Sequence, residues 1–167
     1  MTTQQHPILI FLFALILTSP ILSKGSGLKP CQESQFFNMV KDYNPYSFSV
    51  TTADGYKNRL YSISKEVNKE YPIIYLRHGF MDSSNSWVIN DDKASIAKNL
   101  ANKGYHVVLG NHRGNMYSLD SDKNLSDDKK KDYWDYGFQD MAKYDIPAAL
   151  IKINKKFEKK IVYIGHS

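Results

Sequence analysis

The chain has 167 residues, enough for one folded domain with a sizeable core. Its hydrophobic content of 42% and charged content of 23% are those of a globular protein and exclude a disordered chain. The net charge of +5 comes from lysine runs, but acidic residues lie among them, as in Asp127-Asp128 before Lys129–Lys131. That mixture indicates a solvated surface and argues against a nucleic-acid-binding protein.

The first residues have the pattern of a targeting segment. Ile8–Leu17 is an unbroken apolar run, and the small-residue site Ser23-Lys24-Gly25 follows it, which is the order of a secretory signal peptide. We therefore expect residues 1–25 to be a signal peptide and the mature protein to be secreted. The alternative is an uncleaved membrane anchor through residues 8–22, although the run is shorter than the ~20 apolar residues of a spanning helix.

Two further positions bear on secretion. Cys31 is the only cysteine, so it is either a free buried thiol or the partner of a cysteine beyond residue 167. Asn124-Leu125-Ser126 is a glycosylation sequon in a polar stretch, which makes Asn124 a glycosylation candidate on an exposed loop.

An irregular segment and a hairpin are predicted next. Residues 26–47 are polar, with one short helix expected at Gln35–Lys41. Phe48–Thr52 and Tyr56–Ser64 both alternate apolar and polar residues. Asp54-Gly55 lies between these two runs, and this arrangement predicts an antiparallel β-hairpin.

From residue 72 onward the pattern changes to that of a parallel sheet. Pro72–Leu76, Tyr105–Leu109 and Ile161–Ile164 are short apolar runs, which predict strands buried on both faces. The last of them is expected to be a central strand, and an unpaired edge on such a strand favours aggregation.

Two helices are predicted between these strands. The apolar residues of Lys93–Lys103 recur at helical spacing, and Gly104 predicts the C-terminal cap. Asp145, with Pro147 in the following turn, predicts the N-cap of the second helix. One apolar stripe runs along that helix and consists of Ile146, Leu150, Ile153 and Phe157. The alternation of strands and helices predicts an α/β fold with an antiparallel start, formed by residues 48–167.

The candidate chemistry lies where the strands end, because ligands of open parallel sheets bind at the carboxyl ends of the strands. The first strand leads into His78-Gly79-Phe80, where the glycine permits a sharp turn that aims backbone N–H groups at an oxyanion. An ordinary strand-to-loop turn is the alternative. The second strand leads into Gly110–Asn115, which predicts a tight turn held by side-chain hydrogen bonds, with substrate contact by His112 and Arg113 as the alternative. The third leads into Gly165-His166-Ser167, the first half of a Gly-x-Ser-x-Gly nucleophile elbow.

Together these stretches resemble the acid lipases of the α/β-hydrolase fold, the group that includes gastric and lysosomal acid lipases. The similar stretches follow the family's order and cover most of residues 44–167. They are VTTADGY (50–56), HGFMDSSNSWVIN (78–90), ANKGYHVVLGNHRGN (101–115), YWDYGFQDMAKYDIPA (133–148) and VYIGHS (162–167).

The resemblance implies roles for individual residues. Ser167 would be the nucleophile that forms an acyl-enzyme, and the N–H of Phe80 would be one oxyanion donor. The turns of the site would comprise His78, Gly79, Gly165 and His166. The family's triad order is Ser, Asp, His, so the Asp, the His and the second oxyanion donor would all follow residue 167. We therefore expect the chain to be the N-terminal part of a lipase, inactive by itself, with no metal or organic cofactor.

The resemblance also implies a substrate. It indicates a secreted or lysosomal hydrolase of neutral lipid esters, such as triacylglycerols or sterol esters, with transient contact to a lipid interface. The family usually has leucine where Phe80 stands, and the larger ring would narrow the acyl pocket. Trp87 and the aromatic residues of Tyr133–Phe138 match family positions and are expected in the core. Two alternatives stay open: another α/β-hydrolase, such as an esterase or peptidase, and a non-catalytic lipid-binding or interaction module.

Overall fold

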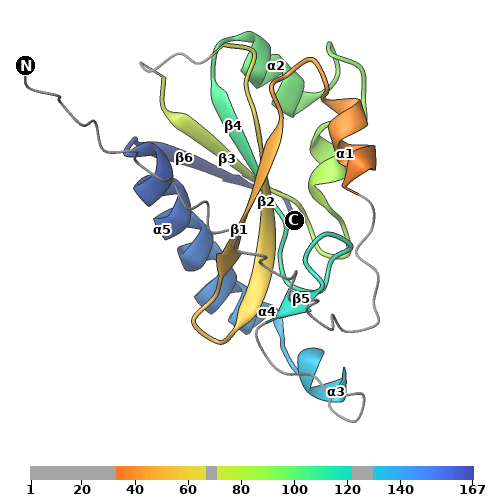
Figure 1. The fold of residues 1–167 in the computed structure, drawn as a ribbon, viewed down its shortest axis with the longest axis vertical. Helices are drawn as coiled ribbons and strands as arrows, with labels where there is room; N and C mark the ends of the chain where they lie inside the picture. Colours follow the sequence, from red (N-terminus) through yellow and green to blue (C-terminus); the bar gives the residue numbers. More distant parts are fainter. Residues whose placement is uncertain (1–32, 67–70, 122–129) are drawn as a thin grey trace, which may run out of the picture.

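The computed structural model describes residues 33–66, 71–121 and 130–167, which form one sheet flanked by helices (Figure 1). The strands are β1 (Tyr46–Thr51), β2 (Tyr56–Ile63), β3 (Ile73–Arg77), β4 (His106–Gly110), β5 (Asp120–Ser121) and β6 (Ile161–Gly165). The helices are α1 (Ser34–Met39), α2 (Ile96–Asn102), α3 (Lys130–Tyr133), α4 (Phe138–Asp140) and α5 (Ile146–Phe157). A 3-10 turn, η1, spans Ser84–Trp87, and a π-helical turn, η3, spans Met141–Asp145.

Several predictions from the sequence fall outside these ranges. The proposed signal peptide, Cys31 and Asn124 all lie outside the described residues. Within the described ranges, no helix combines the length and the apolar character needed to cross a membrane.

The predicted hairpin is confirmed. β1 and β2 pair antiparallel, and the N–H of Thr52 donates to the carbonyl of Tyr56 at 2.8 Å across the turn. Gly55 has φ +93°, a left-handed conformation that a residue without Cβ adopts easily. The hydroxyl of Thr52 donates to Asp54 at 2.6 Å, which fixes the Asp54 carboxylate at the hairpin tip.

The parallel part of the sheet is also confirmed, so the fold is α/β with an antiparallel start. The strand order is β1-β2-β4-β3-β6, and β3 pairs parallel with both β4 and β6. All five residues of β3 are buried, as expected for a central strand. Its carboxyl end therefore lies beside the carboxyl ends of β4 and β6, where the candidate residues are.

Two apolar cores cover the two faces of the sheet (Figure 1). On one face, α1, α2 and η1 pack through residues that include Phe36, Ala97 and Trp87. On the other face, α5 packs through Ala149 and Ile153. Of the predicted apolar stripe, Leu150, Ile153 and Phe157 belong to this core, whereas Ile146 lines a cavity at the end of the sheet. Trp87, expected in the core, is 8% exposed there.

The sheet ends at β6, which pairs only with β3 within the described chain. Its apolar side chains are partly exposed, with Val162 at 44%, Tyr163 at 41% and Ile164 at 38%. This is the unpaired apolar edge expected from the sequence.

The predicted N-cap at Asp145 is wrong. The chain is already helical in α4 and η3, and Asp145 itself has helical dihedral angles (φ −71°, ψ −46°) and makes no capping hydrogen bond. Its carboxylate is instead fully buried against Arg113. The helix predicted at Lys93–Lys103 is shorter than expected, because Ser95 caps it by accepting a hydrogen bond from the N–H of Lys98. Gly104, with φ +90°, follows its end as predicted.

Candidate active site

Ser167 is the second residue after β6. The N–H of His166 donates to the carbonyl of Arg77 at 3.0 Å, which carries the β3–β6 pairing to the last residue before the serine. Ser167 then has φ +62°, a left-handed conformation that is uncommon for a residue with a side chain and stores strain. The serine of a nucleophile elbow likewise has a strained backbone conformation directly after a strand.

The turn after β3 packs directly on this serine. A Cβ placed on Gly79 would lie 3.0 Å from the Cβ of Ser167 and 3.2 Å from Nδ1 of His166. Glycine is therefore needed at position 79 because the backbones of the two strand ends approach so closely. The sequence placed Gly79 and Ser167 at separate strand ends, and the structure brings them into contact.

Phe80 follows this glycine, and its backbone N–H is available. Within the described residues, this N–H donates to no protein acceptor. Phe80 and Ser167 line one cavity of about 320 Å³, together with His78, Gly165 and His166. The backbone then turns back at Met81, which has φ +58°. An oxyanion hole requires an unpaired donor and the serine to share one site, and Phe80 and Ser167 share this cavity.

His78 fixes the peptide between Gly79 and Phe80. Asn115 sets which ring nitrogen of His78 carries the proton. The N–H of Tyr117 donates to Oδ1 of Asn115 at 2.9 Å, so the nitrogen Nδ2 of Asn115 is the atom that lies 3.1 Å from Nε2 of His78. Because Nδ2 can only donate, Nε2 of His78 accepts, and the proton sits on Nδ1. Nδ1 donates to the carbonyl of Gly79 at 2.8 Å. Since a trans peptide points its C=O and N–H in opposite directions, this bond also sets the direction of the Phe80 N–H.

Burial keeps this histidine neutral. Desolvation, assisted by His112, lowers the pKa of His78 to about 3. The two imidazole rings lie 4.2 Å apart, and burial also lowers the pKa of His112. His78 is not suited to act as the general base for Ser167, since both of its ring nitrogens are already hydrogen-bonded.

The turn after β4 is held by side-chain hydrogen bonds, as predicted. Oδ1 of Asn111 accepts from Nδ2 of Asn115 at 2.7 Å and from the N–H of Ser84 at 3.0 Å. The N–H of Gly114 donates to the carbonyl of Ser118 at 3.0 Å. These bonds join the turn after β4 to the turn that carries His78.

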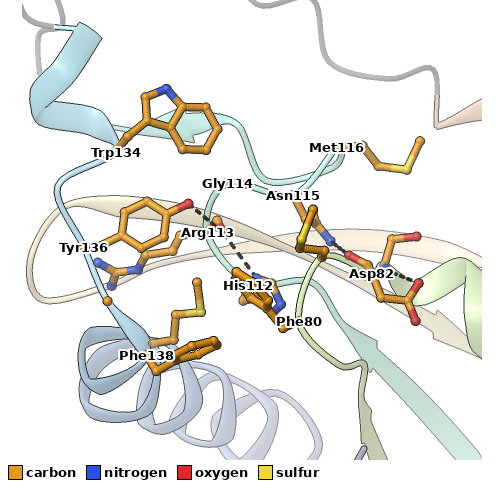
Figure 2. Close-up of a pocket in the computed structure, with 14 residues that line it drawn as sticks. Phe80, Asp82, His112, Arg113, Gly114, Asn115, Met116, Trp134, Tyr136 and Phe138 are labelled. Carbon is orange, nitrogen blue, oxygen red and sulfur yellow. Dashed lines mark hydrogen bonds between the residues drawn. The ribbon is translucent and has the colours of Figure 1, made fainter. Parts of the chain in front are cut away.

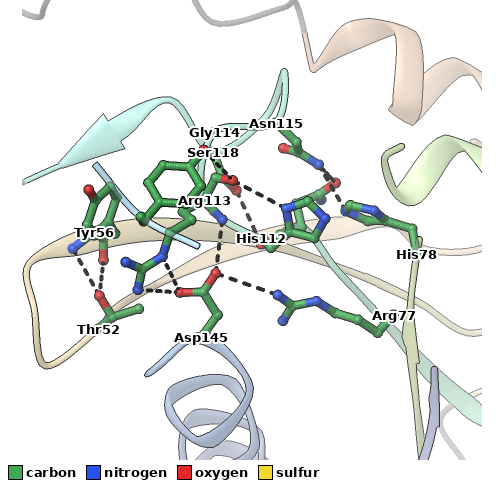
Figure 3. Close-up of polar contacts among 12 residues, drawn as sticks. Thr52, Tyr56, Arg77, His78, His112, Arg113, Gly114, Asn115, Ser118 and Asp145 are labelled. Atoms are coloured by element: carbon green, nitrogen blue, oxygen red, sulfur yellow. Dashed lines mark hydrogen bonds and ion pairs between the residues drawn. The ribbon is translucent and has the colours of Figure 1, made fainter. Parts of the chain in front are cut away.

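A buried charge cluster lies beneath these turns (Figure 3). Oδ1 of Asp145 accepts from Nε and Nη2 of Arg113 at 2.9 and 2.8 Å, and Nη1 of Arg113 binds Asp54 at 2.6 Å. Nη2 of Arg77 lies 3.6 Å from the same Asp145 carboxylate. Burial alone would lower the pKa of Arg113, but the hydrogen bonds to Asp54 and Asp145 raise it above its usual value. The cluster ties the hairpin tip, the β4 turn and η3 together.

A second, larger cavity of about 710 Å³ adjoins the first (Figure 2). It is lined by Met81, Met116, Trp134, Tyr136 and other residues, and it shares Phe80, His112, Phe138 and Met141 with the smaller cavity. Trp134 and Phe138 were expected in the core, and that prediction is wrong: they are 49% and 61% exposed and form cavity wall. Tyr133, by contrast, is 2% exposed and belongs to the interior as expected.

The surroundings of Ser167 contain no partner for its hydroxyl and no metal-binding cluster among the described residues. In the part of the chain that the structure describes, no histidine or carboxylate hydrogen-bonds to its hydroxyl, and no group of three or more His, Cys, Asp or Glu residues could hold a metal ion.

Comparison with known proteins agrees with this geometry. The family model described as a partial α/β-hydrolase lipase region matches residues 38–91. Lipase member K of Homo sapiens is 36% identical over 155 residues, which cover 86% of this chain and 38% of that protein. The lysosomal acid lipase/cholesteryl ester hydrolase of Rattus norvegicus is 32% identical over 168 residues, covering 96% and 42%. This chain belongs to the acid lipase family of the α/β-hydrolase fold.

This acid lipase family member is also similar to a gastric lipase and, in its fold, to a bacterial phospholipase. The gastric triacylglycerol lipase of Rattus norvegicus is 37% identical over 147 residues, covering 83% of the chain and 32% of that protein. The chain thus spans between 32 and 42% of the length of these three lipases. A crystal structure of a membrane phospholipase A, a bacterial virulence factor, superposes with a TM-score of 0.52 at 20% identity, over 80% of this chain and 35% of that one. That likeness concerns the fold alone.

Proposed function

We propose that this protein is a serine ester hydrolase that cleaves neutral lipid esters, either triacylglycerols or sterol esters. The observation that carries the proposal is the left-handed conformation of Ser167, which packs against Gly79 and lines one cavity with Phe80. The substrate class is supported by the relatives, one called a gastric triacylglycerol lipase and another a lysosomal acid lipase/cholesteryl ester hydrolase.

The chemistry follows from these positions. The hydroxyl of Ser167 attacks the ester carbonyl carbon and loses its proton to a general base. The N–H of Phe80 donates to the carbonyl oxygen as negative charge develops there. The tetrahedral intermediate collapses, the alcohol leaves with the proton, and water then cleaves the acyl-enzyme. We propose that the base, its carboxylate partner and the second oxyanion donor come from sequence after Ser167, as the family's triad order implies.

The same resemblance leads to a cellular location. We propose that residues 1–25 are a signal peptide, that residues 48–167 form part of the hydrolase domain, and that the protein is secreted or lysosomal. Transient contact with a lipid interface is part of this proposal, because the substrate is insoluble.

The test uses a family-length protein, meaning a protein that contains this chain and has the full length of the lipases it resembles. The measured reactions are hydrolysis of p-nitrophenyl butyrate and of an emulsified triacylglycerol. Ser167→Ala is expected to lower kcat/KM by about a thousandfold or more, because it removes the nucleophile. The matched control is Ser49→Ala, an exposed serine on β1 that is expected to leave the rate unchanged. Faster cleavage of peptides than of esters would overturn the substrate class, and full activity of Ser167→Ala would overturn the nucleophile.

Residues 1–167 alone provide a second test. We expect them to hydrolyse p-nitrophenyl butyrate no faster than buffer, since serine without a base is a weak nucleophile. Activity of this chain that disappears in Ser167→Ala would show that the base lies within it.

A further inference from the structure

Two phenylalanine rings separate the two cavities. Phe80 follows the turn after β3, and Phe138 begins α4, so the rings come from distant parts of the sequence. Their centroids lie 4.7 Å apart at an interplanar angle of 63°, an edge-to-face contact (Figure 2). Both side chains line both cavities, and they are 56% and 61% exposed. This Phe80–Phe138 pair is therefore a boundary between cavities and not a part of the core.

The larger cavity has the lining expected for a hydrocarbon chain. Its apolar wall includes Met81, Met116 and Met141, and methionine side chains adapt to flexible ligands. Trp134 adds a large aromatic surface. The volume of about 710 Å³ falls within the range of roughly 300 to 1,000 Å³ that is usual for small-molecule sites.

Three polar residues on the same wall already make hydrogen bonds within the protein. Asp82 accepts from the N–H of Ser83 at 2.7 Å, Asn115 is bound to His78 and Asn111, and Arg113 is bound to Asp54 and Asp145. A polar ligand would have to displace these bonds, whereas an apolar chain would leave them intact. The wall thus favours an apolar occupant.

The cavity is continuous with the proposed reaction centre. Four residues line both cavities, and the smaller one contains Ser167. We propose that the larger cavity binds the straight hydrocarbon chain of a lipid ester, and that the Phe80–Phe138 pair is the constriction through which this chain reaches Ser167. This inference rests on the proposed function, and it makes the two rings determinants of chain-length preference.

The first test compares ester chain lengths in a family-length protein. The readout is the ratio of kcat/KM for p-nitrophenyl dodecanoate to that for the butyrate. Phe138→Ala widens the constriction and is expected to raise this ratio about tenfold, and Phe80→Leu is expected to raise it less. The control is Ile151→Ala, an apolar side chain on α5 that is 68% exposed and remote from both cavities. A ratio that falls, or stays within about twofold of wild type in both variants, overturns the constriction.

Two series of ester substrates show whether the acyl chain or the alcohol chain of the ester enters the larger cavity. Alkyl acetates vary the alcohol chain, whereas the p-nitrophenyl alkanoates vary the acyl chain. The series whose length dependence responds to Phe138→Ala contains the chain that the larger cavity binds. No response in either series overturns the inference while leaving ester hydrolysis established.

Binding without turnover provides an independent readout. Trp134 lines the larger cavity whereas Trp87 is buried in the core, so a ligand in that cavity is expected to produce a fluorescence change that is present in the wild type and absent in Trp134→Phe. Affinity for 1-alkanols of four to ten carbons is expected to rise about fourfold per methylene, and Trp134→Phe is expected to abolish the signal. Affinity independent of chain length overturns the cavity assignment. A protein that binds alkanols in this way but cleaves no ester would contradict the proposed function and leave the cavity assignment in place.

Discussion

Neutralising Asp145 tests whether the buried charge cluster holds the proposed site together. Asp145 has no exposed surface, and its carboxylate faces two guanidinium groups, those of Arg113 and Arg77. Asp145→Asn keeps the volume but removes the charge, so both arginines lose a buried counter-charge. Breaking a buried pair from one side costs about 3–5 kcal/mol of unfolding free energy. Arg113 keeps Asp54, whose side chain is 24% exposed, so we expect the lower end, about 3 kcal/mol.

The assay is urea unfolding followed by circular dichroism, with thermal unfolding alongside. For a chain of this size, about 3 kcal/mol corresponds to a melting temperature lower by about 6–12 °C. The control is Glu33→Gln, which breaks a partly exposed pair with Arg59 (2.8 Å, side chains 33% and 37% exposed) and is expected to cost less than about 1 kcal/mol. If Asp145→Asn costs no more than this control, the cluster does not stabilise the fold and the reasoning is refuted.

Three further predictions concern the turns around the site. Gly114→Ala is expected to destabilise the protein by about 2 kcal/mol or more in urea unfolding, because φ is +77° and a Cβ would collide with the Tyr136 hydroxyl; a smaller loss would contradict the clash. Gly79→Ala is expected to lower kcat/KM for p-nitrophenyl butyrate about a hundredfold in a family-length protein, since its Cβ would press on Ser167, and an unchanged rate would count against the close packing. The unfolded state binds a proton at His78 below pH 6.5 and the native state does not until about pH 3, so the stability that His78 contributes is complete above pH 6.5 and is lost as pH falls toward 3. The unfolding free energy should therefore fall less between pH 7 and pH 5 in His78→Gln than in the wild type, and the two slopes should differ by up to about 1.4 kcal/mol per pH unit. Identical slopes in the two proteins would argue against a neutral buried imidazole.

The sheet could be predicted because its signals are local. The Asp54-Gly55 turn between alternating runs marks the β1–β2 hairpin, and the apolar runs at β3, β4 and β6 mark strands buried between helices. The expected catalytic turns could be located for the same reason, since each directly follows one of these strands. What the sequence did not show is that Gly79 touches Ser167, because that contact depends on β3 and β6 being neighbours.

The wrong predictions concern side chains whose surroundings are set by residues distant in the sequence. Asp145 before Ile146-Pro147 has the same local pattern whether its carboxylate caps a helix or binds an arginine, and Arg113 lies 32 residues earlier in the chain. Nothing in the sequence around Asp145 distinguishes the two. Trp134 and Phe138 were assigned to the core from their match to family positions, and their apolar character does not distinguish an interior side chain from the wall of a cavity.

The π-helical turn η3 has a consequence for how this chain can vary in length. Phe138, before the turn, and Met141, its first residue, face the cavities, whereas Ala149 and Ile153, after the turn, face the sheet. Each residue of an α-helix advances the direction of the side chain by about 100°. Deleting or inserting one residue within η3 would therefore rotate the cavity-lining side chains relative to the sheet-packing face. Insertions and deletions among functional relatives are accordingly expected to spare this turn, even where neighbouring loops differ in length.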